Sequence, residues 1–190
     1  MPDFPNKKYQ IIYADPPWDY EFGETLSRFV KNKYPLMTFE EICSLPVGSI
    51  AADNSILLMW ATFPKLEWAI PVMKAWGFNY RTCAFVWIKA NKKTNVRQTS
   101  FLPVDNLEAF TGMGYYTRSN AEICLLGKRG DALERKRHDI HQIVYEPIQE
   151  HSRKPAVVRK NIVKLFGDLS RIELFARQKT EGWDVWGNEV

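Results

Sequence analysis

The chain has 190 residues, which is enough for one compact domain with a sizeable core and hardly enough for two. With 45% hydrophobic and 14% aromatic residues, among them seven tryptophans, the composition excludes a disordered chain. The net charge of +4 favours polyanionic partners only mildly. No window approaches the roughly 20 apolar residues of a membrane span, and the N-terminus has no apolar signal region. We therefore expect one cytoplasmic domain over residues 1–190, with no membrane partner.

The predicted elements alternate between strands and helices. In chain order they are a strand over 9–14, a helix from 38, a strand over 55–60, a helix over 66–76, strands over 80–88, 121–126 and 142–145, a helix over 155–165, and strands over 171–176 and 183–186. The strands are short apolar runs, and the helices show helical spacing with capping signals. Thr38 and Glu41 form a capping-box pattern, and Gly77 and Gly167 stand where helices should stop. This order predicts an α/β fold with a mostly parallel sheet and helices on both faces.

Two polar residues follow directly on predicted strands at opposite ends of the chain. Asp15 comes after the strand over 9–14, and Arg177 comes after the strand over 171–176. Open parallel sheets bind ligands beyond the carboxyl ends of their strands. If both strands are parallel, the two side chains lie at the same edge and belong to one site.

The segment Asp15-Pro16-Pro17-Trp18 offers an unusual set of hydrogen-bond acceptors. Each proline locks φ and lacks an N–H, so the carbonyls are firmly aimed beside the carboxylate. Such acceptors suit an exocyclic amino group, such as that of adenine, on which positive charge develops during reaction. The tryptophan could stack on the base, a contact worth about 1–3 kcal/mol. The alternative is that the prolines merely end a strand in a turn.

Basic residues gather in two places that could contact phosphate. The first candidates are Lys89, Lys92, Lys93 and Arg97, at the start of a long segment without a clear element. A second basic run lies over 128–137, and its alternative interpretation is a solvated face. No metal site is expected, because His138 and His141 have only one plausible third ligand nearby. The three cysteines are predicted to be reduced core thiols.

The strand followed by DPPW resembles the adenine-N6 methyltransferase family. That family includes the catalytic subunit of the eukaryotic mRNA adenosine methyltransferase and bacterial and phage DNA methyltransferases. Further segments resemble the family in the same order along the chain, namely ILLMW, WGF, FVWIK, NAEICLLGKRG, HSRKP, IELFAR and WGN. The resemblance implies a Rossmann-like methyltransferase that uses S-adenosyl-L-methionine, with a permuted motif order in which the catalytic motif comes first.

The resemblance also implies roles for individual residues. The catalytic segment is Asp15, Pro16, Pro17 and Trp18. The cofactor is expected to meet Asp15, to bind its methionine carboxylate at Lys154, and to bind its ribose at Arg177, Asn188 and Glu189. The target adenine is expected near Tyr34 and Glu122. The chain departs from its relatives at Glu189, where they carry an amide, and upstream of the first strand, where only Asp3 is acidic and the contact to the cofactor adenine stays unassigned.

The expected reaction is transfer of a methyl group from S-adenosyl-L-methionine to the N6 amino group of adenine in DNA. RNA is the alternative substrate, and a non-catalytic nucleic-acid-binding partner subunit is the alternative function. The intact Asp15-Pro16-Pro17-Trp18 segment argues against the second alternative. We expect a monomer or homodimer in the cytoplasm of a bacterial or phage-infected host cell.

Overall fold

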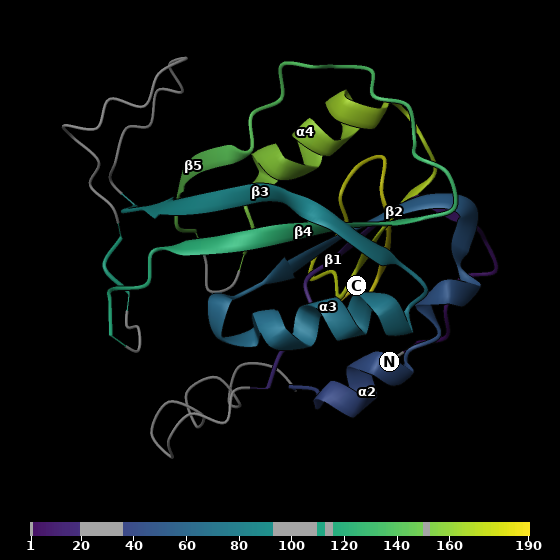
Figure 1. Ribbon diagram of the computed structural model, residues 1–190, viewed down its shortest axis with the longest axis horizontal. Helices are drawn as coiled ribbons and strands as arrows, with labels where there is room; N and C mark the ends of the chain where they lie inside the picture. The colour runs from purple at the N-terminus through teal and green to yellow at the C-terminus, as the bar shows by residue number, and fades with distance from the viewer. Residues whose placement is uncertain (1, 20–35, 93–109, 113–115, 150–152) are drawn as a thin grey trace. The chain divides into compact units, whose positions relative to one another are not determined.

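The computed structural model describes residues 2–19, 36–92, 110–112, 116–149 and 153–190 (Figure 1). In chain order its elements are β1 (Tyr9–Ala14), α2 (Phe39–Ser44), a 3-10 turn (Val47–Ser49), β2 (Ala51–Ala61), a 3-10 turn (Phe63–Lys65), α3 (Leu66–Ala75), β3 (Asn79–Ala90), β4 (Ala121–Arg129), β5 (Ile143–Pro147), α4 (Ala156–Phe166), β6 (Arg171–Leu174) and β7 (Asp184–Trp186). The strands form one sheet in the order β5-β3-β4-β2-β1-β6-β7. Parallel pairings join β1 to β2 and β6, β6 to β7, and β3 to β5, which confirms the predicted α/β class.

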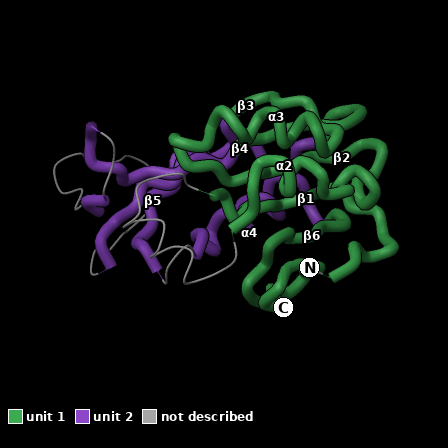
Figure 2. The backbone as a smooth tube through the Cα atoms, turned by 90° about the horizontal axis from the view of Figure 1, so that it is seen from below, with its two compact units in different colours: residues 1–82, 125–133, 169–190 green, residues 83–124, 134–168 purple. Residues whose placement is uncertain are grey.

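The chain divides into two compact units (Figure 2). Unit 1 comprises residues 1–82, 125–133 and 169–190, and unit 2 comprises residues 83–124 and 134–168. Unit 1 therefore contains β1, β2, β6, β7, α2 and α3, whereas β5 and α4 belong to unit 2. None of the described helices is long and apolar enough to cross a membrane.

In unit 1, β1 lies between β2 and β6 and forms the centre of the core. Every residue of β1 except Gln10 is buried. At its carboxyl end, Ala14 lies opposite Met59 of β2 and Leu174 of β6, and Leu174 lies opposite Trp186 of β7. Neighbouring parallel strands thus end nearly level, so the residues that follow β1, β6 and β7 leave the sheet at one edge.

The tryptophans serve mainly as core residues, as the sequence predicts. Six of the seven are buried, from Trp60 at 0% to Trp183 at 8% exposed. The three cysteines are free thiols, and Cys124 is fully buried. The high aromatic content of the chain therefore reflects core packing more than an exposed stacking surface.

In each unit, a local signal in the sequence marks a helix boundary close to its predicted position. Thr38 caps α2 in a capping box, in which the Thr38 side chain accepts from the Glu41 N–H and the Glu41 carboxylate accepts from the Thr38 N–H. In unit 2, Gly167 follows α4 with φ of 84°, a backbone conformation that glycine adopts without a steric penalty. The apolar stripe of α4 is buried at Val158, Ile162 and Phe166, one residue per turn.

Several strand boundaries differ from the prediction, and two of these differences show a physical cause. β2 begins at Ala51 and not at 55. Its first four residues include the exposed polar residues Asp53 and Asn54, so this part of the strand has no apolar pattern from which it could be predicted. β6 ends at Leu174 and not at 176, because Phe175 adopts φ of 60°. That left-handed conformation is strained for a residue with a side chain and turns the backbone out of the strand. The Phe175 ring packs edge-on against Trp186, which offsets part of the strain.

Candidate active site

The Asp-Pro-Pro-Trp segment leaves unit 1 at the carboxyl end of its central strand. Asp15 follows Ala14 directly and is partly buried, and Pro16 is buried. Because β1 has parallel partners on both sides, the segment emerges between the ends of β2 and β6. This is the position at which open parallel sheets bind ligands, as the sequence predicts for Asp15.

Backbone hydrogen bonds fix the two proline carbonyls. The Trp18 N–H donates to the carbonyl of Pro16 at 2.9 Å, and the Met37 N–H donates to the carbonyl of Pro17 at 2.9 Å. A carbonyl oxygen has two lone pairs, so each retains capacity for one more donor. The segment is therefore a closed turn whose acceptors are held in place before any ligand arrives.

The Trp18 side chain is buried beneath this turn. Only 4% of the residue is exposed, and its indole N–H donates to the carbonyl of Trp60 at 3.2 Å. Sequence reasoning assigned the ring to base stacking, whereas its hydrogen-bonding end is directed to the carboxyl end of strand β2. Most of the ring's surface is thus in contact with protein.

The residues expected around the cofactor ribose lie after β6 and β7 in unit 1. Arg177, Asn188 and Glu189 are all exposed, and the Arg177 Nε lies 3.7 Å from Glu189 Oε1. Between β7 and Asn188, Gly187 packs closely on the neighbouring backbone. A Cβ at Gly187 would lie 2.5 Å from the carbonyl oxygen of Ala176, so any side chain would push these two segments apart.

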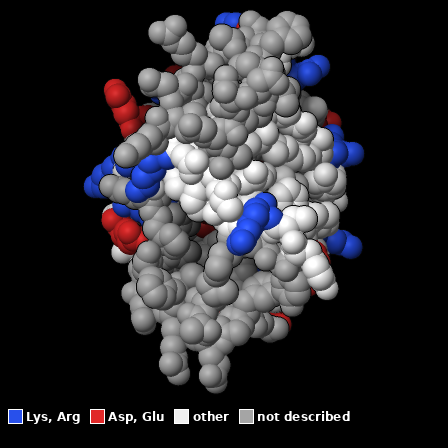
Figure 3. Space-filling view, turned by 90° about the vertical axis from the view of Figure 1, so that its left-hand side faces the viewer, with Lys and Arg blue, Asp and Glu red and all other residues white. Residues whose placement is uncertain are grey.

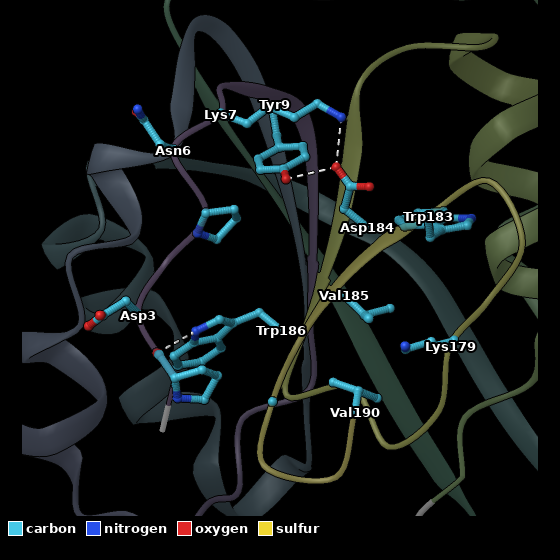
Figure 4. A pocket seen from close by; sticks show the side chains of 13 residues that line it. Asp3, Asn6, Lys7, Tyr9, Lys179, Trp183, Asp184, Val185, Trp186 and Val190 are labelled. Atoms are coloured by element: carbon cyan, nitrogen blue, oxygen red, sulfur yellow. Dashed lines mark hydrogen bonds and ion pairs between the residues drawn. The ribbon is translucent and has the colours of Figure 1, made fainter.

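A pocket of about 630 Å³ adjoins these residues in unit 1 (Figure 4). It lies between the N-terminal segment and β7, and its walls include Asp3, Trp186, Gly187 and Val190. The N-terminal segment is held there by two contacts of Trp186, whose ring stacks on Phe4 at 4.3 Å and whose N–H donates to the carbonyl of Pro2 at 2.9 Å. At its other end, the Tyr9 hydroxyl and Lys7 Nζ both bond to Asp184.

Unit 2 contains a buried cluster of three charged residues. Glu122 Oε1 lies 2.6 Å from Lys89 Nζ, and Glu122 Oε2 lies 2.9 Å from Lys154 Nζ. The side chains are 12% (Glu122), 19% (Lys89) and 8% (Lys154) exposed. We call these three residues the lysine–glutamate cluster. Glu122 is thus the anion that both buried lysines contact, one on each of its carboxylate oxygens.

The lysines control the ionisation of Glu122. Burial by itself raises the pKa of this carboxyl, but Lys154 and then Lys89 outweigh the effect and lower the pKa to about 2. Glu122 is therefore ionised throughout the physiological range, and the two lysines share its charge. Sequence reasoning placed Lys89 among the phosphate ligands and did not foresee its ion pair, because residues 33 positions apart carry no local pairing signal.

The other predicted basic contacts are dispersed or lie outside the described residues. Lys92 is exposed, while Tyr34, Lys93 and Arg97 fall in the segments that are not described. Three cations of the run over 128–137 already have partners: Arg129 donates to the carbonyl of Gly48, Lys136 pairs with Glu134, and Arg137 pairs with Asp139. On the face drawn in Figure 3, the visible Lys and Arg side chains stand at several separate places. The described residues contain no group of three or more potential metal ligands.

Comparison with known proteins identifies the family of this chain. The sequence profile of the MT-A70 family matches residues 9–189. The chain belongs to the MT-A70 family. Its α/β sheet, with the DPPW segment at the end of the central strand of unit 1, is the Rossmann-like methyltransferase fold that the resemblance implies.

Three relatives show how far the similarity of this MT-A70 chain extends. It is 38% identical to the Type II methyltransferase M.MunI of Mycoplasma sp over 208 aligned positions, which include 100% of this chain and 81% of that protein. It is 30% identical to the human N(6)-adenine-specific methyltransferase METTL4, over 97% of this chain and 38% of the human protein. It is 26% identical to the N6-methyladenosine RNA methyltransferase MTA1 of Cryphonectria parasitica, over 96% of this chain and 52% of the fungal protein. The chain thus spans most of M.MunI and about half or less of the two eukaryotic proteins, and it is a methyltransferase like them.

Proposed function

We propose that this methyltransferase transfers a methyl group from S-adenosyl-L-methionine to the N6 amino group of adenine in DNA. The observation that carries the proposal is the position of Asp15 and its two prolines at the carboxyl end of β1, in a chain of the MT-A70 family. The similarity to an N(6)-adenine-specific methyltransferase supports adenine N6 as the acceptor atom.

The Asp15 carboxylate and a proline carbonyl are suited to hold the reacting amino group. The lone pair of an adenine amino nitrogen is delocalised into the ring, so the nitrogen is a poor nucleophile. Hydrogen bonds from both of its N–H groups to fixed acceptors favour a pyramidal nitrogen and stabilise the positive charge that develops on it. Asp15 supplies a charged acceptor, and the Pro16 carbonyl keeps one lone pair for a second donor. The cofactor, when bound, supplies an activated methyl group on a sulfonium.

The lysine–glutamate cluster fits the carboxylate of the cofactor's methionine part. Its two ammonium groups are largely buried, and a carboxylate accepts strong, charge-assisted hydrogen bonds from such a group. Lys154 is the more buried of the two lysines, and it is the one that the resemblance assigns to this carboxylate. In this arrangement Glu122 orients Lys154, in addition to its predicted place near the target adenine.

The pocket beside β7 fits the adenosine part of the cofactor. Its volume of about 630 Å³ lies within the range of small-molecule sites. Gly187 and Val190 line it, and they flank Asn188 and Glu189, which are expected at the cofactor ribose. Asp3 lines the same pocket, and a change of rotamer would bring its carboxylate into position to accept from the cofactor's adenine amino group. This contact was unassigned from the sequence, because only the fold returns the N-terminal segment to β7.

The comparison with relatives favours DNA as the polymer. The chain is 38% identical to a Type II methyltransferase and covers 81% of it, against 26% identity to an RNA methyltransferase of which it covers 52%. An adenine in duplex DNA must be flipped out of the stack to reach a site of this kind. We propose that Lys92 and the predicted contacts Lys93 and Arg97 hold the backbone in that step, and that Tyr34 contacts the flipped base.

The test is a transfer assay with radiolabelled S-adenosyl-L-methionine and adenine-containing DNA or RNA. We expect label on DNA, and modified-base sequencing of host DNA after expression should reveal N6-methyladenine. Asp15→Ala should lower turnover by at least about 10²-fold while cofactor affinity by calorimetry stays within a few-fold. Asp131→Ala, at an exposed carboxylate of unit 1, is the matched control and should leave turnover unchanged.

The alternatives give different results in the same assay. Label on RNA alone would assign the protein to the RNA branch of the family. No label on either polymer, together with no heat of cofactor binding, would replace the enzyme with a non-catalytic nucleic-acid-binding subunit. Full turnover of Asp15→Ala would show that the carboxylate is not an essential acceptor.

A further inference from the structure

Two buried hydrogen bonds link Trp18, Trp60 and Tyr13 next to the DPPW segment. The Trp18 indole N–H donates to the main-chain carbonyl of Trp60 at 3.2 Å, and the Trp60 indole N–H donates to the Tyr13 hydroxyl at 2.5 Å. All three residues belong to unit 1. We call them the aromatic relay. Tyr13 lies two residues before Asp15, and Trp18 lies three residues after it. The relay therefore connects the two ends of the segment 13–18, which contains the acceptors.

The three residues of the relay are buried in the core, where apolar side chains would need no hydrogen-bond partners. Trp60 and Tyr13 are both 0% exposed, and Trp18 is 4% exposed. Each polar group in such a place must have a partner, because an unsatisfied buried donor carries its full desolvation cost. Phenylalanine or leucine would fill the space without that requirement. The hydrogen bonds of the indole N–H groups therefore fix the orientations of the rings, which apolar packing alone leaves free.

The relay holds the end of the acceptor segment that the sheet does not hold. Before Asp15, the backbone is fixed by the pairing of Ala14 with Met59 and Leu174. After Pro17, it is fixed by the Met37 N–H and by the buried Trp18 side chain. Loss of the relay would weaken the second support, in which only the Met37 bond would remain, and leave the first intact. The acceptors would then lose alignment while the fold persists.

We propose that Tyr13 and Trp60 are positioning residues for methyl transfer, which act through Trp18 to align Asp15 and the Pro16 carbonyl. This inference rests on the proposed function, because it assigns the segment's rigidity to that reaction. It also gives Trp18 an anchoring task that differs from base stacking. Displacement of reacting groups by about 1 Å can cost up to 10²-fold in rate, so a modest change in the relay has a large kinetic effect.

Tyr13→Phe is the decisive variant, because it removes a single hydroxyl and leaves the Trp60 N–H without its acceptor. Ser55→Ala is a matched control in the neighbouring strand β2. Ser55 is 0% exposed, and its hydroxyl donates to the carbonyl of Ala52 at 2.8 Å, near the amino end of β2. Each variant loses one hydrogen bond of a fully buried hydroxyl, so both should melt at a lower temperature. We expect kcat to fall about 10-fold or more in Tyr13→Phe only, with the KM values for DNA and cofactor within about two-fold.

A second measurement does not depend on turnover. In protein labelled with ¹⁵N-tryptophan, the indole N–H of Trp18 should exchange with solvent faster in Tyr13→Phe than in wild type, and at an unchanged rate in Ser55→Ala. Equal kcat in the two variants would overturn the positioning role. Unchanged Trp18 exchange in Tyr13→Phe would overturn the relay itself. If wild type transfers no methyl group, the proposed function fails, and the exchange experiment still decides whether the relay holds Trp18.

Discussion

The acceptor segment of unit 1 and the lysine–glutamate cluster of unit 2 are organised by opposite means. In unit 1, Asp15 is carried on a turn fixed by backbone bonds and by the indole of Trp18. In unit 2, Lys89, Glu122 and Lys154 hold one another by charge in a nearly dry place. Hydrogen-bonded geometry is insensitive to pH and salt, whereas a buried charge cluster couples to both protons and anions. Damage to the first should therefore appear in kcat, and damage to the second in stability, pH dependence and cofactor affinity.

The largest effect of this contrast is expected for Glu122→Gln. The change is nearly isosteric, and it removes the negative charge that both buried lysines contact. Removing one partner of a buried ion pair costs about 3–5 kcal/mol. Glu134→Gln is the control, because the Glu134–Lys136 pair is highly exposed and its loss should change unfolding little. Urea unfolding at pH 7 measures both. Equal midpoints for Glu122→Gln and wild type would mean that the lysines are neutral or solvated.

The same residue sets a pH window. The folded pKa of Glu122 is lowered to about 2, from an ordinary value of 4.5. A carboxyl with a lowered folded pKa contributes stability that is present above its unfolded pKa and is lost as pH falls toward its folded pKa. Wild type should therefore lose more stability than Glu122→Gln between about pH 4.5 and pH 2. Parallel pH curves for the two proteins in this window would contradict the lowered pKa.

A smaller and more specific effect is expected for Lys154→Met. Methionine keeps most of the buried length but removes the charge, and Glu122 retains Lys89 as its partner. The variant lacks the ammonium group that the resemblance assigns to the methionine carboxylate, so we expect affinity for S-adenosyl-L-methionine to fall about 10- to 100-fold, or about 1.4–2.8 kcal/mol. Lys92→Met removes an exposed charge from the same unit and should leave cofactor affinity unchanged. Calorimetry with equal dissociation constants for the two variants would exclude Lys154 from the cofactor site.

The two regions also differ in how much of each the sequence predicts. The strand over 9–14, its end at Asp15 and the capping box at Thr38 are local patterns, and the structure reproduces them. The edge shared by Asp15 and Arg177 follows from parallel pairing, which strand and helix alternation implies. These predictions succeed because apolar periodicity and proline stops act within a few residues.

Contacts between distant residues were not predictable in the same way. The anchoring of Trp18 by Trp60, the pairing of Lys89 with Glu122 and the return of Asp3 to β7 each depend on strand order and side-chain direction. The sequence around a lysine does not indicate whether its ammonium group contacts a phosphate or a buried carboxylate. The end of β6 before Phe175 was also not predictable from the sequence. Phe175 has a strained φ that is stabilised by packing against Trp186, and this tertiary contact leaves no local sequence signal.

The smallest effect is expected for Glu189→Gln, which introduces the amide that the resemblance to the family implies for this position. The Arg177–Glu189 contact is 3.7 Å long, and the two side chains are 34% and 53% exposed. Such surface pairs contribute about 0–1 kcal/mol, so the melting temperature should not change measurably. An amide oxygen still accepts from a ribose hydroxyl, so cofactor affinity should stay within about two-fold, whereas Glu189→Ala should weaken binding several-fold. If Glu189→Gln weakens binding as much as Glu189→Ala, the carboxylate charge is required, and this edge of unit 1 depends on electrostatics as the lysine–glutamate cluster does.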